Sequence, residues 1–398
     1  MFEIRPILSA LSRHKSSTLL IIMQIAITFA VVVNSISIIQ QRVSLMNRDS
    51  GLKEEQIFSL NITAYAKDYD IEQNMRADLE VLRNTPGIID AVALNSIPMS
   101  GSGSATSVAN TRENFDNDVN FSTGVLWGGT HAINTLGVNL IAGRNFREDE
   151  VRFDDGTNVP TVVIVTQSLA DKLFPDGDAL GKQIFRGSYD VTIVGIIEHM
   201  SGFWSSWSGF NLNMILPKLE TNNILIRAEK NAIPELLGSI EKVLFDRNPE
   251  RVVSSMRTMS EHRARSYSSD HAMSVILWVV ISLLVVITSL GIVGIVSFNI
   301  SQRTKQIGTR RALGARKVDI HRYFITENIL ITSVALIVGT ILAVAFNVYL
   351  VDAFEMTPIN WYYLPIGILA MLLMGIFSVW MPAQKASNVS PAVATQNI

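Results

Sequence analysis

The chain has 398 residues, of which 48% are hydrophobic and only 17% are charged. Soluble domains usually carry about 25% charged residues, so this composition indicates a membrane protein. The chain contains no cysteine, which excludes disulfides, thiol catalysis and cysteine-ligated zinc.

The first apolar segment, residues 17–39, is long enough to cross a membrane. A spanning helix needs about 20 mostly apolar residues, and this segment contains no Asp, Glu, Lys, Arg or His. Its apolar run is longer than that of a typical cleaved signal peptide. We therefore expect an uncleaved span that continues outside the membrane as a stalk helix over about 40–50. Residues 1–16 are expected to form an amphipathic segment before it.

The next region alternates strand-like and helix-like segments. Residues 57–63 and 88–95 have strand character, and the amphipathic stretch 70–87 between them ends at Pro86-Gly87, a typical helix stop. This pattern predicts a β-α-β unit. The tract 100–118 is rich in Gly, Ser and Asn, which predicts a loop.

A second group of short strands and helices extends from about 119 to 200. Strands near 211–217 and 222–228, a helix near 231–249 and a strand at 250–256 follow. The pattern predicts an α+β domain over 40–271 with β-α-β pieces at both ends, an insertion in the middle, and a polar stalk helix over 258–271.

Three more spans are predicted at 272–298, 329–351 and 362–381, none of them charged. Gly291 and Gly294 in the second span either permit close helix packing or face lipid. The loop 299–322 is strongly basic, with Asp319 as its one acid. Since Lys and Arg accumulate in cytoplasmic loops, this loop, the N-terminus and the tail 382–398 are predicted to be cytoplasmic and 40–271 external.

Motifs for catalysis or cofactor binding are not found. The string "GDALGKQI" has the wrong spacing for a phosphate loop and carries Gln183 where Ser or Thr is required. The six histidines show no metal-ligand spacing, and the basic loop lacks the aromatic residues typical of nucleic-acid binding. We expect no catalytic residue, no metal, no cofactor and no nucleic-acid partner in this chain.

The basic loop has features beyond membrane anchoring. Its periodicity predicts a short helix in which Ile307, Ala312 and Leu313 form an apolar face beside Arg310 and Arg311. Glycines in the loop allow bends and close approach. Such a helix suits docking of a soluble partner, whereas the simpler interpretation is positive-inside anchoring alone.

Three stretches resemble MacB/FtsX-type ABC transporter permeases (type VII, the mechanotransmission family). The first is "RTKQIGTRRALGA" from Arg303, close to the family pattern E-R-T-x-E-I-G-I-R-x-A-x-G-A. The others are "VIVTQSLADKLFPDGDALGKQI" with "VTIVGIIEHM", and "MPAQKASNVSPAVA" near the C-terminus. The resemblance covers essentially the whole chain. It implies an α-helical membrane protein with four transmembrane helices plus an α+β periplasmic domain inserted between helices 1 and 2.

The resemblance also implies an organisation and a set of partners. Parts 55–98 and 203–258 correspond to a porter-like subdomain, and 119–200 to an inserted one. Two copies of an ABC ATPase subunit, which bind ATP and Mg, are expected to dock on the loop between spans two and three. A second permease copy or a paralogous permease, a periplasmic adaptor and an outer-membrane duct are further expected partners beside membrane lipid. The ATPase-coupling residues implied are Arg303, Lys305, Gln306, Ile307, Gly308, Arg310, Arg311, Ala312, Leu313 and Gly314.

The expected function is that of a permease subunit in a bacterial inner membrane. It would couple ATP hydrolysis on a separate chain to motion of the periplasmic domain, and so drive efflux of a drug, peptide or similar substrate. Alternatives within the family are lipoprotein release and FtsX-like regulation of wall hydrolases. A membrane sensor is a further alternative, although such proteins usually carry a cytoplasmic signalling domain.

Two positions depart from the family pattern. Gln302 and Gln306 stand where the motif has acids, and Thr309 replaces the usual Ile. This departure indicates either one specialised half of a heterodimer or ordinary family drift.

Overall fold

The computed structural model describes residues 15–66, 69–154, 156–187, 189–220, 223–354 and 357–389. The chain divides into two compact units. One contains the described residues up to Ser44 and those from Asp270 onward, and the other is Leu45–Ser269. Most of the expected amphipathic N-terminus and the end of the expected tail lie outside the described residues.

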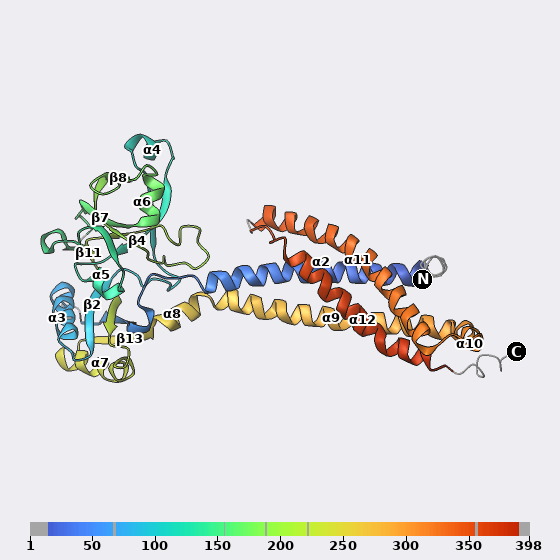
Figure 1. Cartoon of the computed structure of the whole chain (residues 1–398). Helices are drawn as coiled ribbons and strands as arrows, with labels where there is room; N and C mark the ends of the chain where they lie inside the picture. Colours follow the sequence, from blue (N-terminus) through green and yellow to red (C-terminus); the bar gives the residue numbers. More distant parts are fainter. Residues whose placement is uncertain are drawn as a thin grey trace. The chain divides into compact units, whose positions relative to one another are not determined.

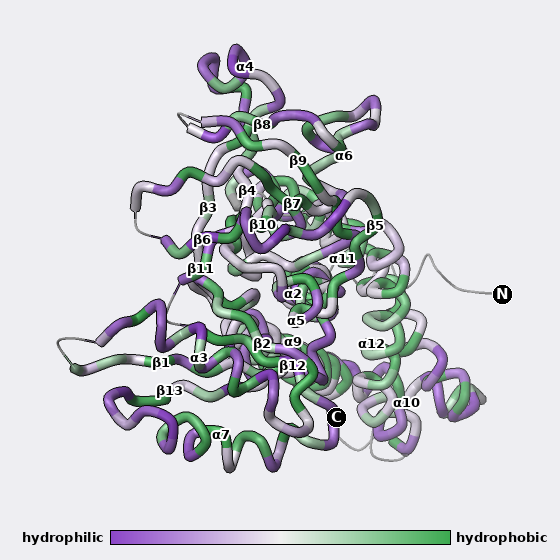
Figure 2. The backbone as a smooth tube through the Cα atoms, turned by 90° about the vertical axis from the view of Figure 1, so that its left-hand side faces the viewer, coloured by the Kyte–Doolittle hydropathy of each residue, from purple (hydrophilic) through white to green (hydrophobic). Residues whose placement is uncertain are grey.

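Four long helices make up most of the first unit, and Figure 1 shows them beside the short helix α10 (Thr304–Ala312). The four long helices are α2 (Lys15–Met46), α9 (Ser268–Gln302), α11 (Lys317–Phe354) and α12 (Tyr363–Ser387). Each is long and apolar enough to cross a membrane, which confirms the predicted four-helix architecture. In Figure 2 the α12 tube is mostly hydrophobic in colour. The helices extend past the predicted spans because hydropathy marks only their apolar parts.

The four helices pack around a shared apolar core. Phe29 of α2 is fully buried and shares this core with Ile292, Ala335 and Val379 from the other three helices. Small residues allow the close approach, as is usual for membrane helices. A Cβ added at Gly339 would lie 3.1 Å from the Cα of Ala26 on α2.

The two glycines singled out in the second span behave differently. A Cβ at Gly291 would lie 2.5 Å from Oε1 of Gln24 on α2, so this glycine permits helix contact. A Cβ at Gly294 would meet no described atom within 4 Å. Only Gly291 therefore has a packing role within the described chain.

A polar clamp joins α2, α11 and the segment before α12. Nδ2 of Asn34 donates to the carbonyls of Ala30 at 2.9 Å and Ala343 at 3.1 Å. Nδ2 of Asn347 donates to Oδ1 of Asn34 at 3.2 Å. Oδ1 of Asn347 accepts from the Ile359 amide at 3.1 Å. Hydrogen bonds of this kind hold membrane helices together in one register.

The second unit begins with a four-stranded antiparallel sheet. Its order is β13 (Arg251–Thr258), β1 (Ile57–Ala64), β12 (Asn223–Ala228) and β2 (Ile88–Leu94). Helix α3 (Ile71–Arg83) connects β1 to β2, and α7 (Ile233–Arg247) connects β12 to β13. Two β-α-β units therefore interleave their strands in a split arrangement. Both units were predicted from the sequence.

Both faces of this sheet are covered. The apolar sides of α3 and α7 pack on one face through residues such as Leu79 and Ile240. On the other face, Leu94 and Leu225 pack with Leu136 of α5 (Ala132–Leu136). Burying each such leucine contributes about 1.5–3 kcal/mol.

The start of α3 is fixed by Asp70, whose side chain accepts from the Gln73 amide at 2.9 Å.

A second sheet forms the inserted part. Its order is β3 (Ser104–Val108), β4 (Phe121–Trp127), β10 (Asn213–Leu216), β7 (Val162–Thr166), β9 (Tyr189–Ile197) and β5 (Leu140–Gly143), with β8 (Gln183–Arg186) also paired to β9. The short strands β11 (Lys218–Leu219) and β6 (Arg152–Phe153) pair with each other. Further short helices of the domain are α4 (Arg112–Asp116), α6 (Gln167–Leu173), and the 3₁₀ turns Glu54–Gln56 and Glu148–Glu150.

Three structural assignments predicted from the sequence are wrong. The expected loop 100–118 contains β3 and α4, because the Ser and Thr residues of β3 give little hydrophobic alternation. The second porter-like part does not start at 203, since β10 pairs with β4 and β7 in the inserted sheet. The stalk 258–271 is not one helix. Thr258 caps α8 (Met259–Ser266), and α9 starts at Ser268.

Candidate coupling segment

The segment between α9 and α11 contains the predicted short helix, α10 (Thr304–Ala312). The chain leaves α10 through Gly314, which has φ +99°. Glycine adopts this left-handed conformation without strain. The side chain of Asp319 accepts from the Arg316 amide at 2.9 Å and so satisfies a free donor at the start of α11. Gly314 thus fixes where α10 ends, and Asp319 fixes where α11 begins.

A buried ion pair anchors the start of the segment. Nη1 of Arg303 donates to both carboxylate oxygens of Glu327 on α11, at 3.0 and 3.2 Å. The two residues are only 8% and 7% exposed. Burying charges is costly, and removing one partner leaves the other uncompensated, at about 3–5 kcal/mol. The pair therefore fixes the end of α9 against α11.

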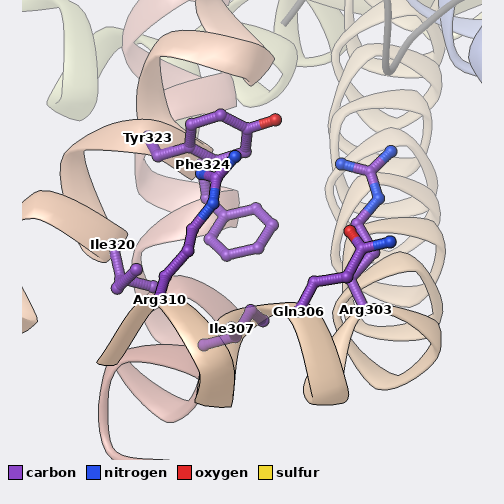
Figure 3. A pocket seen from close by; sticks show the side chains of 7 residues that line it. All are labelled: Arg303, Gln306, Ile307, Arg310, Ile320, Tyr323 and Phe324. Carbon is purple, nitrogen blue, oxygen red and sulfur yellow. The ribbon is translucent and has the colours of Figure 1, made fainter. Parts of the chain in front are cut away.

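Apolar packing fixes the inner face of α10. Ile307 is buried together with Ile320 and Phe324 of α11. Figure 3 shows these residues around a small cavity, with the Arg303 and Gln306 side chains on its other side. The cavity has a volume of about 30 Å³, which is room for only a few waters at most. Little free space separates α10 from α11.

The side chain of Arg310 lies along Tyr323, as Figure 3 shows. Its guanidinium carbon is 5.0 Å from the centre of the tyrosine ring, which is the range of a cation–π contact. Arg310 is nevertheless exposed. The contact holds an exposed cation in one direction without neutralising its charge.

The outer face of the segment is cationic. Lys305 and Arg310 are exposed, and Arg311 is half-buried. None of the three forms an ion pair with a residue in the described ranges. Leu313 is 84% exposed at the end of the helix. This face combines uncompensated positive charge with one projecting apolar side chain, which suits an acidic protein surface. In Figure 2 the tube around α10 is mostly hydrophilic in colour.

The structure separates the ten predicted coupling residues into two groups. Arg303, Ile307 and Gly308 are buried, so they hold the segment in place. The half-buried or exposed ones are Lys305, Gln306, Arg310, Arg311, Ala312, Leu313 and Gly314.

The expectation that Ile307, Ala312 and Leu313 share one apolar face is wrong. At about 100° per residue, positions five and six residues apart point in different directions. Ile307 is buried, whereas Ala312 and Leu313 face outward.

Sequence reasoning missed Glu327 and Tyr323. Glu327 lies two residues before the predicted span 329–351. An isolated acid at the edge of an apolar helix needs a partner, and that signal could have identified its pairing with a loop arginine. Tyr323 offered no comparable signal, because its contact with Arg310 depends on the turn at Gly314.

Comparison with known proteins matches most of the chain to two family models. The MacB-like periplasmic core domain matches residues 18–242, and the FtsX-like permease C-terminal region matches residues 278–391. The first match covers the described strands of both sheets up to β12, and the second covers α10 to α12 with much of α9. The chain is therefore a multi-pass membrane protein of the ABC-transporter permease class. It belongs to the MacB/FtsX-type permease family.

Two curated relatives illustrate the similarity. The macrolide export ATP-binding/permease protein MacB of Neisseria meningitidis serogroup A (strain Z2491) is 28% identical over 322 residues, which are 75% of this chain and 46% of the relative. The protein of the same name from Neisseria gonorrhoeae (strain FA 1090) is 27% identical over 312 residues, with the same coverages of 75% and 46%. The chain thus spans about half the length of these relatives.

A solved structure also aligns with the chain. The periplasmic region of MacB from Actinobacillus actinomycetemcomitans has 14% sequence identity and a TM-score of 0.34. The alignment covers 55% of this chain and 95% of that one.

Proposed function

We propose that this chain is a permease subunit that couples ATP hydrolysis on a partner ABC ATPase dimer to motion of its α+β domain. The output is efflux of a drug, peptide or similar substrate from the periplasm with an adaptor. The observation that carries the proposal is the outer face of α10. It presents unpaired cations on a helix that is fixed from within by Arg303, Glu327 and Ile307.

The orientation of the proposal follows from charge. Basic residues concentrate in the 299–322 segment, whereas the predicted loop between the last two spans has Asp352 and Glu355 and no Lys or Arg. The positive-inside rule then assigns α10 and both termini to the cytoplasm of a bacterial inner membrane. ATP and Mg belong to the ATPase, which meets α10 on that side.

The ten predicted coupling residues have different proposed roles, which follow from their exposure. Lys305, Arg310, Arg311 and Leu313 meet acids and an apolar pocket on the ATPase. Gln306, which lines the cavity beside α11, lies at the edge of this contact. Arg303, Ile307 and Gly308 transmit the displacement of α10 to α9 and α11, because these three residues are buried between the helices. Ala312 and Gly314 shape the turn that follows α10.

The proposed complex contains two permeases. A second copy of this chain or a paralogous one completes it. Gln302 is exposed, and Gln306 lies where the family pattern has its second acid, so their neutral side chains make this α10 more cationic than the pattern. A paralogue with acids at both positions would give the two ATPase subunits unequal docking surfaces.

Charge reversal tests the coupling role. In the full chain in lipid nanodiscs, Arg310→Glu combined with Arg311→Glu should reduce ATPase co-purification by at least tenfold, because two attractive contacts become repulsive. The charge-preserving pair Arg310→Lys and Arg311→Lys is the matched control and should retain most binding. Both double variants should insert normally. Normal complex formation and ATP-dependent export in the charge-reversed protein would refute the assignment.

A further inference from the structure

A polar cleft lies within the α+β domain, where the first sheet meets the loop 95–102 and helix α8. Its volume is about 240 Å³. Strands β1, β12 and β13 contribute one wall, and the loop that leads to β3 contributes another. The cleft therefore adjoins the segment that joins the two sheets of the domain.

The side chains that line the cleft are almost all hydrogen-bonding groups. Asparagines 61, 95 and 223, five serines and His262 surround it, while Leu60 and Ile97 are its two apolar members. Among the described residues, no acid and no Phe, Tyr or Trp lines it. A cleft of this composition favours a hydrophilic ligand. The missing aromatic platform disfavours a ligand bound by ring stacking.

The one lysine or arginine that lines the cleft is Arg257. Its guanidinium forms no ion pair and no hydrogen bond with the described part of the chain. Every other half-buried or buried arginine of β12, β13 and α8 pairs with a side chain or a carbonyl oxygen, as Arg227, Arg251 and Arg263 do. Arg257 is thus available to a carboxylate or a phosphate, which guanidinium groups bind in bidentate geometry.

His262 is the other titratable side chain that lines the cleft. His262 is 6% exposed, and its Nε2 lies 2.7 Å from Oγ of Ser59. Burial lowers the pKa of His262, as do Arg257 and Arg265 nearby. The ring therefore contributes a hydrogen-bonding wall, and Arg257 supplies the positive charge.

Backbone strain marks the same wall. Ser255 has φ +53°, and it lies at a bulge where the register between β1 and β13 shifts. Serine is disfavoured in this conformation, which glycine adopts freely. Strained residues cluster at ligand sites, where the surrounding structure compensates for them. The strain here places a hydroxyl group at the lining of the cleft.

We propose that this cleft binds a small hydrophilic anion that carries a carboxylate or a phosphate group. Arg257 pairs with the anionic group, and the Ser255 hydroxyl binds its polar remainder. The proposal concerns a site remote from α10 in sequence and does not depend on the proposed transport function. It assigns a ligand-binding role to the junction of the two sheets.

Equilibrium titration of the full chain in nanodiscs tests this site. The probes are N-acetyl-diglycine, its C-terminal amide and inorganic phosphate, followed by ligand-detected NMR. We expect the carboxylate peptide or phosphate to bind with a dissociation constant of about 1 mM, typical of a ligand this small. The amide should bind at least tenfold more weakly. Binding of phosphate alone would identify the phosphate group as the anion recognised.

Variants separate binding from folding. Arg257→Gln should weaken binding at least tenfold, Arg257→Lys should weaken it less, and Arg76→Gln on the exposed side of α3 is the matched control. Ser255→Gly should weaken binding about threefold without lowering Tm, because it removes the hydroxyl and relieves the strained φ. No binding at 10 mM of either anion, measurable binding of the acid and the amide with equal affinity, or full binding in a folded Arg257→Gln protein would overturn the proposal.

Discussion

The two units each bury an arginine–carboxylate pair, but the pairs differ in how many elements they join. In the α+β domain, Asp78 of α3 accepts from Arg251 of β13, with one contact at 2.6 Å, and also from Arg247 of α7. Arg251 also donates to the carbonyl of Leu244. In the first unit, which contains the four long helices, Arg303 pairs with Glu327 and so joins the end of α9 to α11 alone. The Asp78 network therefore joins three elements, whereas the Arg303–Glu327 pair joins two.

Removing the centre of the larger network should have the largest effect. Asp78→Ala leaves two buried or half-buried guanidinium groups without their carboxylate, so we expect the α+β domain to lose about 3–5 kcal/mol of stability. Hydrogen exchange of α3, α7 and β13 in the full chain measures this loss. Arg76→Ala breaks an exposed pair with Glu72 on the same helix and should cost under about 0.5 kcal/mol. Equal effects of the two substitutions would contradict the comparison.

The membrane pair should produce a smaller and more local effect. Glu327→Ala strands Arg303 in a buried position, and we expect a loss of about 3 kcal/mol confined to α10 and its neighbours. Faster hydrogen exchange in 303–312, with unchanged exchange in β1 and β12, is the expected result. The double variant Arg303→Met with Glu327→Leu should recover most of the protection. If exchange in α10 does not respond, the pair does not anchor the segment.

Protonation of the buried His262, whose ring shares one hydrogen bond with Ser59, should have the smallest effect on stability. Burial lowers the pKa of His262, which is further lowered by Arg257 and Arg265 and raised by Glu261. Because the folded pKa lies below the unfolded value of about 6.5, this contribution to stability is present above pH 6.5 and is lost as the pH falls below it.

The loss is bounded at about 1.4 kcal/mol for each unit of pKa shift. It appears as a drop in Tm of the α+β domain between pH 7.5 and pH 5.5. His262→Gln should show a smaller drop, whereas an exposed control, His271→Gln, should behave like the unmodified protein. An identical drop in His262→Gln would exclude this histidine as its source.

The type and approximate position of single helices and strands could be predicted from the sequence. Four uncharged apolar runs are sufficient to predict four spans, and Pro86-Gly87 after an amphipathic stretch is sufficient to end α3. Pairings between distant segments were not readable. The strand 213–216 has ordinary strand character, and nothing local indicates that it lies between β4 and β7.

The coupling segment shows the same division. Its basic composition and its helix were predictable from periodicity, whereas the direction of each side chain was not. Arg303 and Arg310 look equivalent in the sequence, yet one is buried against Glu327 and the other is exposed beside Tyr323. The difference arises from α11, which folds back on α10 through the turn at Gly314.

The length of α9 has a mechanical consequence. Its 35 residues make a rod of about 52 Å, and the hydrocarbon core of a bilayer is only about 30 Å thick. With its pivot near Gln302, a tilt of about 10° would sweep the far end through about 9 Å, at 1.5 Å of rod per residue. That end carries Asp270, which is held 2.9 Å from Arg42 of α2. The Arg42–Asp270 pair therefore couples the far end of α9 to α2, and a tilt of α9 alone would break it.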